Sequence, residues 1–395
     1  MKKIKIVDFQ SINDFHEMIN LSIAIICNNI FEETIYKSGK SSNQNIKKLY
    51  ESYSKNKKRN SNIIFIPKYV YDYQNKLAFQ IRIILGFFIT IFEYITTQKK
   101  KEVLLYTYTN AFSFPIILGL NVILQKKIIF LMHGELELQL KKNIPIYKPT
   151  KWYKTFHNIG FKYLLPHTNA CILVLGDSIK MNLCKIHPQI INNVISICHP
   201  YIINKQTNVN ISSISKTLNI GTIGLMNQSK GLNDLIKLSE LLSEEINKNK
   251  LKISSIGKVT DIDINKYNQI KWIGGKESIP RKIFEEEIEK LDYILYLYPT
   301  SSYKLTASGA ILDAIKLKKP IICLNNDYFK YIMQNDAIGY MANNIYEIAD
   351  TIKQLINTPQ NRKDFSLQFQ KLSEKISITY NTELLKNELI NHQIL

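Results

Sequence analysis

Cysteine is scarce in this chain of 395 residues. The five cysteines are odd in number and stand far apart, at Cys27, Cys171, Cys184, Cys198 and Cys323. Most lie inside apolar runs, and no cluster of Cys, His and carboxylate residues has the spacing of metal ligands. This pattern excludes a disulfide framework and a zinc site, and it is typical of buried thiols in a reducing cytoplasm.

Long apolar runs and targeting patterns are also missing. The longest apolar run near the start, Ile83 to Phe92, is shorter than the roughly 20 residues that a membrane-crossing helix needs. The first residues, MKKIKIVDF, lead directly into a strand and show no signal-peptide pattern. No repeat with a period of 20–50 residues is visible. We therefore expect a cytoplasmic protein.

Acidic residues are few beside basic ones: 33 Asp and Glu against 52 Lys and Arg give a formal net charge of +19. Part of this excess reflects a composition rich in Lys, Asn and Ile. A charge this large favours an anionic partner: a nucleotide, a nucleic acid or an anionic membrane surface. Any single cluster of basic residues is also explained by a solvated surface loop that binds nothing. The basic clusters are Lys47-Lys48, Lys55, Lys57-Lys58-Arg59, Lys99-Lys100-Lys101, Lys126-Lys127 and Lys141-Lys142.

What the sequence does contain is a regular alternation of apolar strands and helical patterns. We predict strands at 3–8, 34–36, 62–66, 103–108, 127–132, 170–175 and 194–198, and then at 218–223, 251–256, 270–273, 293–298 and 321–324. The segment 39–60 is polar and lysine-rich and has only a short helical pattern. Such alternation predicts doubly wound parallel sheets and an α/β fold.

Between the two series lies a stretch rich in Asn, Ser and Lys with no apolar pattern. We predict an N-terminal domain at 1–201, a linker at 202–217 and a C-terminal domain at 218–395. The C-terminal helix is a candidate to pack back on the first domain. The expected architecture is two Rossmann-like doubly wound domains facing across a cleft.

Two loops of the second domain carry the signals for an anionic ligand. The first strand of this domain runs out through Gly221 and Gly224, and Lys230-Gly231 then opens a helix. Glycines let a ligand approach the backbone, and a lysine offers a point charge to a diphosphate. An ordinary turn with a surface lysine would look the same, so this motif alone is weak.

The second loop lies inside DYILYLYPTSSYKLTASGAILDAIKLKKPIICL, which starts at Asp292. A buried strand, a loop, a helix and a second strand make a parallel βαβ unit, and ligands bind beyond the carboxyl ends of such strands. Ser308 is a favoured helix cap, and Gly309 would leave backbone N–H groups open to an anion. We predict that this loop holds the phosphates of a nucleotide-linked ligand.

These motifs resemble the C-terminal domain of GT-B-fold glycosyltransferases of the family 4-like, group 1 type. Lys230-Gly231 matches the lysine and glycine of the first family motif. Pro299, Asp313-Ala314 and Lys319-Pro320-Ile321-Ile322 match the second. The resemblance covers roughly the last half to three-fifths of the chain. It implies a nucleotide-sugar donor held by the second domain and an acceptor held by the first.

The chain also departs from the family pattern. Leu225 stands where an arginine is expected, and Leu305 and Asp313 stand where a Glu-x7-Glu pair is expected. The segment 303–309 looks instead like a variant donor loop with a Ser-Gly turn. The resemblance therefore implies these donor-binding residues: Gly224, Lys230, Tyr303, Lys304, Thr306, Ser308, Gly309 and Asp313.

In the first domain, His133-Gly134-Glu135 follows a strand. His133 and Glu135 are the candidate catalytic groups, because either could take a proton from an acceptor hydroxyl. A histidine satisfied by loop backbone is the alternative. His16, which opens the first helix, is a second candidate, and His199 in a Cys-His-Pro turn is expected to be structural.

Two further patterns, an Asp-x-Asp motif and an aromatic helix, each have a structural explanation as well as a functional one. Asp261-Ile262-Asp263 spells a metal-binding Asp-x-Asp, but it lies in a polar stretch, and we interpret it as a loop or helix cap rather than a metal site. The helix from Trp152 mixes aromatics with lysines, which suits a membrane interface; packing on the first sheet is the alternative.

The sequence thus predicts a metal-independent glycosyltransferase that needs no cofactor and acts in cell-surface polysaccharide synthesis. Its partners would be a nucleotide-sugar, a glycan or lipid-linked acceptor and an anionic membrane at the cytoplasmic face. A catalytically inactive GT-B-like assembly partner is the alternative, left open by the missing Glu pair. A nucleic-acid binder has only the net charge in its favour.

Overall fold

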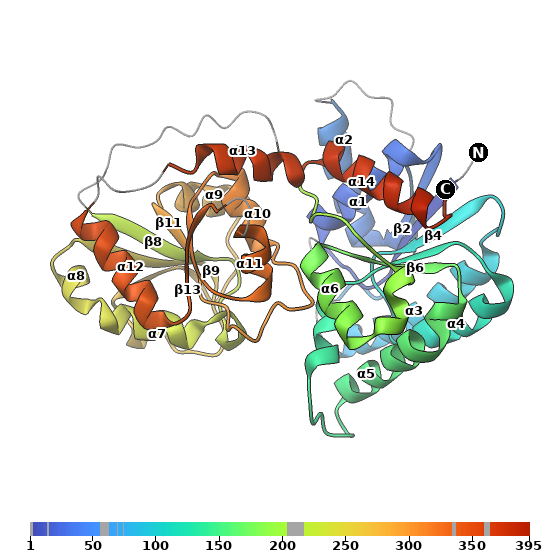
Figure 1. Ribbon diagram of the computed structural model, residues 1–395, viewed down its shortest axis with the longest axis horizontal. Coiled ribbons are helices and arrows are strands. Elements are labelled where there is room, and N and C mark those ends of the chain that lie inside the picture. Colours follow the sequence, from blue (N-terminus) through green and yellow to red (C-terminus); the bar gives the residue numbers. More distant parts are fainter. Residues whose placement is uncertain are drawn as a thin grey trace. The chain divides into compact units, whose positions relative to one another are not determined.

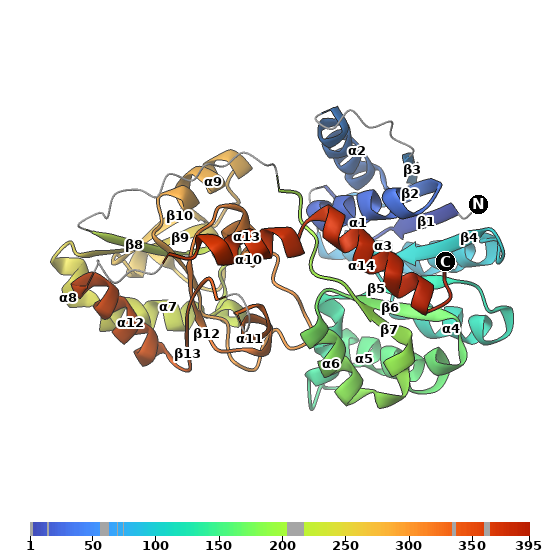
Figure 2. The same ribbon diagram turned by 45° about the horizontal axis from the view of Figure 1, so that its top comes forward.

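The computed structural model describes residues 3–13, 16–55, 63–68, 70–73, 75–203, 217–333, 337–358 and 364–395. The chain divides into two compact units, each built around a parallel sheet (Figures 1 and 2). The first unit comprises 1–202, 305–307 and 375–395, and the second comprises 203–304 and 308–374. Most of the expected linker at 202–217 and the whole Lys57-Lys58-Arg59 cluster lie outside the described residues.

The first sheet has seven parallel strands in the order β3-β2-β1-β4-β5-β6-β7. The chain adds β2 and β3 on one side of β1 and then crosses back to add β4 on the other. Such a reversal places the carboxyl ends of β1 and β4 at a topological switch point, where α/β proteins bind ligands. The strands are β1 (Lys3–Asp8), β2 (Glu33–Gly39), β3 (Ile63–Lys68), β4 (Glu102–Tyr106), β5 (Ile128–Leu131), β6 (Ala170–Val174) and β7 (Val194–Ser196).

Helices cover both faces of this sheet, because alternate residues of each strand point to opposite sides and both sets are apolar. One face packs against α1 (Glu17–Ile30), α2 (Lys40–Lys55) and α14 (Ile378–Asn391). The other packs against α3 (Lys76–Thr96), α4 (Ser113–Leu124), α6 (Asp177–Ile186) and the short helix η2 (Gly160–Leu164). The remaining elements are α5 (Pro149–Ile159), η1 (Gly134–Leu140), η3 (Leu165–His167) and η4 (Pro188–Asn193).

Helix α3 is longer than the apolar run that the sequence shows. Its stretch Leu77–Thr96 is long and apolar enough to cross a membrane by length and composition. In the structure this helix packs on the first unit through Tyr94 and other apolar residues together with the buried polar residues Arg82 and Glu93. The neighbouring cluster Lys126-Lys127 is not a solvated loop, because Lys126 is buried and donates to the carbonyls of Tyr94 and Ile95.

The second sheet has six parallel strands in the order β10-β9-β8-β11-β12-β13. Its strands are β8 (Leu218–Ile223), β9 (Leu251–Lys258), β10 (Ile270–Gly275), β11 (Tyr293–Tyr296), β12 (Ile321–Leu324) and β13 (Gly339–Ala342). The helices of this part of the chain are α7 (Leu232–Leu241), α8 (Ser243–Asn247), α9 (Arg281–Glu289), α10 (Ala310–Lys316), α11 (Asp327–Met333), α12 (Ile345–Asn357) and α13 (Ser366–Lys375), with short turns η5 (Gln228–Lys230) and η6 (Ile264–Lys266). Both units are therefore doubly wound and Rossmann-like.

Three elements differ from the expectation. The polar segment 39–60 contains α2, a helix of 16 residues that buries Ile46 and Tyr50 against α1 and β2. The single helix expected after β8 is divided into α7 and α8 at Leu242. Strand β13, which extends the second sheet beside β12, had no counterpart among the predicted strands.

Candidate functional site

Asp8, at the carboxyl end of β1, organises the loop that follows it. Its buried carboxylate accepts hydrogen bonds from the backbone N–H groups of Gln10 and Ser11, both at 2.9 Å. It also accepts from Asn20 Nδ2 at 2.8 Å and from Thr107 Oγ1 at 3.1 Å. These bonds join the ends of β1 and β4 to α1. They therefore hold the first turns of α1, whose N-cap residue is His16, against the ends of these strands.

His16 and His133 come together in the first unit. Their rings meet edge to face, with centroids 4.6 Å apart. Burial, followed by the nearby His133 ring, lowers the pKa of His16 to about 3. Burial likewise lowers the pKa of His199 to about 4, and its Nδ1 lies 3.3 Å from the Pro200 carbonyl oxygen. His16 is therefore a weak base near neutral pH.

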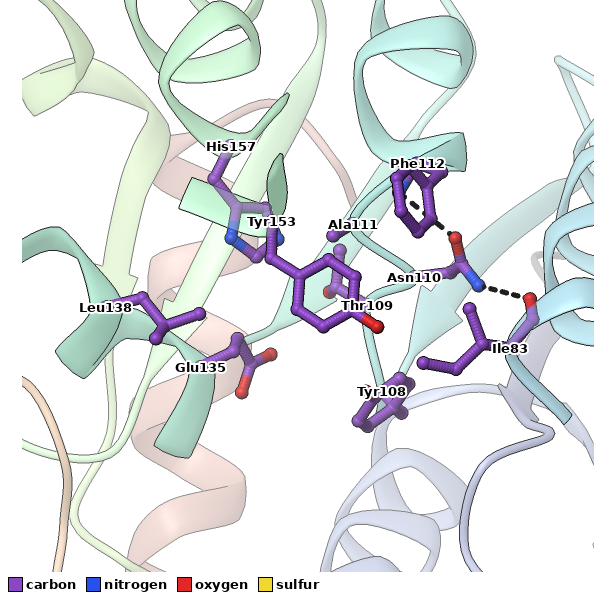
Figure 3. Close-up of a pocket in the computed structure, with 10 residues that line it drawn as sticks. All are labelled: Ile83, Tyr108, Thr109, Asn110, Ala111, Phe112, Glu135, Leu138, Tyr153 and His157. Carbon is purple, nitrogen blue, oxygen red and sulfur yellow. Dashed lines mark hydrogen bonds between the residues drawn. The ribbon is translucent and has the colours of Figure 1, made fainter. Parts of the chain in front are cut away.

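Glu135 lines a small cavity in the first unit, of about 30 Å³, which Figure 3 shows. The loop after β4, the helix η1 and the helix α5 enclose it. Four buried polar atoms on its wall have no hydrogen-bond partner among the described residues: Thr109 Oγ1, Glu135 Oε1 and both ring nitrogens of His157. Burial lowers the pKa of His157 to about 4, so this ring is neutral.

The cavity is the right kind of space for a hydroxyl group. A volume of this size holds about one or two water-sized groups, and its orphaned atoms need such a partner. The hydroxyl-bearing rings of Tyr108 and Tyr153 complete the wall (Figure 3). The second carboxylate oxygen of Glu135 accepts a hydrogen bond from the backbone N–H of His133 at 3.2 Å. This bond places the cavity next to the pair of His16 and His133.

Thr306 is placed apart from the other donor-binding candidates. The segment Leu305–Ala307 belongs to the first unit, where the Leu305 side chain is fully buried. The Leu305 N–H donates to Glu137 at 2.8 Å, and Thr306 Oγ1 donates to the His133 carbonyl at 3.3 Å. The structure therefore groups Thr306 with His133 rather than with Lys230.

In the second unit, Lys230, Tyr298 and Tyr303 form a column. The Lys230 ammonium lies 5.7 Å from the centre of the Tyr298 ring, and the Tyr303 ring stacks on Tyr298 with centroids 4.4 Å apart. Loss of hydration lowers the pKa of Lys230, and among the described residues its side chain has no carboxylate partner. A half-buried cation without a counter-charge is a binding point for an anion.

Glycines leave open space at two of the predicted backbone positions. A Cβ added to Gly224 or Gly309 would meet no atom within 4 Å. Gly231 is different: its φ is +84°, and an added Cβ would lie 2.0 Å from the Leu297 carbonyl oxygen. Gly231 is thus required for the turn itself, whereas Gly224 and Gly309 expose backbone that a ligand can approach.

Ser308 does not cap the helix as expected. Helix α10 begins at Ala310, the residue before it is Gly309, and no side chain caps this end. Ser308 is buried instead, with its hydroxyl 3.5 Å from the Tyr298 hydroxyl. The Ser308 hydroxyl therefore lies beside the stacked Tyr298 and Tyr303 rather than at the helix end.

The structure distinguishes the two remaining donor candidates. Asp313, on α10, is ion-paired with Arg281 of α9, so a partner of its own already offsets its charge. Lys304 is half-buried and follows Tyr303 directly. Asp263 caps the short turn η6 by accepting from the Asn265 N–H at 3.3 Å, as predicted for this stretch.

A larger hollow, of about 510 Å³, lies in the second unit on the strands β9 and β10 and the helix α9. None of the donor-binding candidates lines it. The candidate donor residues lie elsewhere: Lys230, which has no carboxylate partner among the described residues, and the open Gly224 and Gly309.

The sequence did not point to four residues that line the cavity beside Glu135: Tyr108, Thr109, Tyr153 and His157. The only signal available was that Tyr108 and Thr109 directly follow a strand.

No family model and no curated protein sequence matches this chain. Solved structures do. Over 99% of this chain and 100% of the other, it is similar to HepE from Anabaena in complex with UDP, with a TM-score of 0.64 and 13% identity. A glycosyltransferase from Rickettsia africae gives a TM-score of 0.60 and 15% identity over 100% of this chain and 98% of the other.

A third match is a variant of TarM from S. aureus in complex with fondaparinux, α-GlcNAc-glycerol and UDP. It gives a TM-score of 0.62 at 15% identity over 98% of this chain and 99% of the other. At such low identity the likeness concerns architecture, and it spans nearly the full length of both chains in each pair. The two Rossmann-like units of this protein therefore have the fold of the GT-B glycosyltransferases.

Proposed function

We propose that the protein is a glycosyltransferase that transfers a sugar from a nucleotide-sugar to a glycan or lipid-linked acceptor. The observation that carries the proposal is Lys230: a half-buried ammonium without a counter-charge among the described residues, beside a tyrosine column in the second unit. Solved neighbours of the same fold are complexes with UDP and with UDP-glucose. The negative charge of a nucleoside diphosphate would supply the counter-charge that Lys230 lacks among the described residues.

In the proposed reaction, the bond between the anomeric carbon and the diphosphate oxygen breaks, and a bond to an acceptor oxygen forms. The leaving diphosphate keeps the electron pair, and Lys230 with the backbone N–H groups near Gly224 and Gly309 offsets its charge without a metal or cofactor. The acceptor proton passes to His133 or Glu135 of the first unit. The acceptor hydroxyl enters the cavity beside Glu135.

The pathway is also a proposal. One structural neighbour, WaaG, is a glycosyltransferase involved in lipopolysaccharide biosynthesis, at 11% identity and a TM-score of 0.59. Together with the charge of +19, this supports cell-surface polysaccharide synthesis at the cytoplasmic face of an anionic membrane.

The test is a screen of nucleotide-sugars by thermal shift, followed by an assay for released free nucleotide. We expect one donor to raise the melting temperature and to be turned over when a lipid-linked acceptor is added, and turnover to survive a metal chelator. Binding without turnover would favour an inactive assembly partner. Strong, salt-sensitive DNA binding with no nucleotide effect would contradict the proposal outright.

A further inference from the structure

Helix α3 buries several polar residues and exposes many apolar ones. Its polar residues face the sheet: Arg82, Thr90 and Glu93 are all nearly fully buried. Ala78, Ile83 and Tyr94 are buried beside them. Much of the apolar surface of α3 nevertheless faces outward, with exposed fractions of 68% for Leu77, 63% for Phe88 and 60% for Phe92. A helix on the surface of a water-soluble unit normally shows the reverse pattern. The outward stripe therefore needs an explanation other than the core of this unit.

Arg82 and Glu93 both have partners that fix the orientation of α3, although the Arg82 Nε has none among the described residues. Arg82 donates to the carbonyls of Tyr71 and Tyr73, both at 2.8 Å. Glu93 pairs with Lys37 of β2 at 2.7 Å. Turning the helix over would carry Glu93 out to solvent and leave the largely buried Lys37 ammonium without its carboxylate, which is strongly unfavourable. For the same reason we do not interpret α3 as a membrane-crossing helix.

The adjacent helix α4 continues the same surface. It packs against α3 and contains no charged residue. Its polar residues Ser113 and Asn121 are buried and bond to α3, through Thr90 at 2.9 Å and Tyr94 at 3.1 Å. Its outward residues are again apolar, and Ile123 is 81% exposed. Figures 1 and 2 show the two helices in the same layer of the first unit.

We propose that the outward surface of α3 and α4, called here the α3–α4 face, docks on an anionic lipid bilayer. It offers almost no hydrogen-bonding groups, whereas a protein interface has about one hydrogen bond per 100–200 Å². The only acidic residue of the two helices is Glu93, which is buried.

The flanks of the α3–α4 face have the charge that this occupant requires. Three exposed lysines, Lys99, Lys100 and Lys101, follow α3 directly. Trp152 and Tyr163, both exposed, stand on α5 and η2, which pack beside α4. Basic residues and amphipathic aromatics bordering an apolar helix face are the combination that binds the interface of an anionic membrane. This inference stands independently of the proposed sugar transfer.

The experiment is co-sedimentation of the full chain with vesicles of phosphatidylglycerol and phosphatidylethanolamine, and with phosphatidylcholine vesicles for comparison. The test variants are the double substitution Phe88→Ser with Phe92→Ser, and Lys99→Gln with Lys100→Gln and Lys101→Gln. The matched controls are Ile390→Ser on α14, 53% exposed, and Lys47→Gln with Lys48→Gln on α2; both helices cover the opposite face of the sheet.

We expect the native chain and both controls to bind the anionic vesicles. The apolar double variant should lose at least tenfold in binding at any salt concentration. The lysine variant should lose binding mainly at low salt, because a surface attraction of this kind is screened by salt. All variants should keep the native melting temperature, since the changed side chains are exposed.

Two outcomes would overturn the proposal. Equal vesicle binding by the native chain and the apolar double variant would place the contact elsewhere. A chain that binds no vesicles but is a dimer by light scattering, and becomes a monomer on the Phe88 and Phe92 substitutions, would show that a second copy covers the α3–α4 face.

Discussion

The ammonium group of Lys230 lies over the ring of Tyr298, 5.7 Å from its centre. An aromatic face stabilises a cation only in part, and the lowered pKa of Lys230 shows that its hydration is reduced. We expect Lys230→Ala to weaken UDP binding by roughly 1.5–3 kcal/mol, or about ten- to a hundredfold, with little change in melting temperature. Calorimetric titration measures this. Lys237→Ala, on the exposed side of α7, is the control and should bind as the native chain does.

Gly309 and Gly231 should respond in opposite ways to an added side chain. Gly309→Val meets open space at an ordinary φ, so the melting temperature should barely move while donor binding is almost lost. Gly231→Ala would force a Cβ into the Leu297 carbonyl, so it should unfold the second unit at a lower temperature. If the valine variant transfers sugar at a near-native rate, the donor site is not at this loop.

Glu135→Gln keeps the shape of the cavity wall and removes the charge. If Glu135 receives the acceptor proton, turnover should fall by about 10²–10⁴ while UDP affinity stays the same. His133→Ala should behave alike if the imidazole receives the proton, and the comparison of the two variants identifies the base. His16→Gln is the control, because a ring whose pKa is about 3 contributes little as a base near neutral pH, and a loss under tenfold is expected.

His157 should make the first unit sensitive to acid. The pKa of His157 is about 4 in the folded chain and 6.5 in the unfolded chain. Between pH 6.5 and pH 4 the unfolded chain therefore binds a proton at this residue that the folded chain does not bind. Stability is full above pH 6.5 and is lost as the pH falls towards 4. At pH 5 the loss from this group is about 2 kcal/mol.

His157→Phe removes that dependence. The ring already packs among Phe114 and Phe161, so an apolar ring suits the site. Chemical denaturation at pH 7 and pH 5 checks it: the native chain should lose about 2 kcal/mol more than the variant between the two pH values. Equal losses would show that His157 is not the responsible group.

Most of this fold can be predicted from the sequence because short apolar runs bounded by turns, such as those that form β8 and β12, are typical of buried strands. It fails where tertiary contacts decide. Segment 339–342 has a half-exposed pattern and is a strand only because it pairs with β12. Helix α2 is so polar that its apolar stripe, with Ile46 and Tyr50, is visible only once α1 is placed beside it.

The site divides in the same way. Lys230 and Gly309 could be proposed from the sequence because a loop at a strand end has a sequence signal. The cavity beside Glu135 could not, because it needs Thr109 and His157, which lie on separate elements and whose orphaned atoms are defined only in three dimensions. The N-cap expected at Ser308 was wrong: α10 begins at Ala310, and the Ser308 hydroxyl lies beside the Tyr298 hydroxyl instead.

Helix α14 affects the order in which the chain can fold during synthesis. Its Ile378, Leu385 and Leu389 are buried in the same core as Ile19 and Ile23 of α1. During synthesis α1 is made before the second unit and α14 after it, so the part of α1 that α14 covers stays exposed while the second unit is made. Domains ordinarily fold in order from the N-terminus as they emerge. Here the core of the first unit can be completed only once α14 has been made, and the second unit is free to finish folding before it.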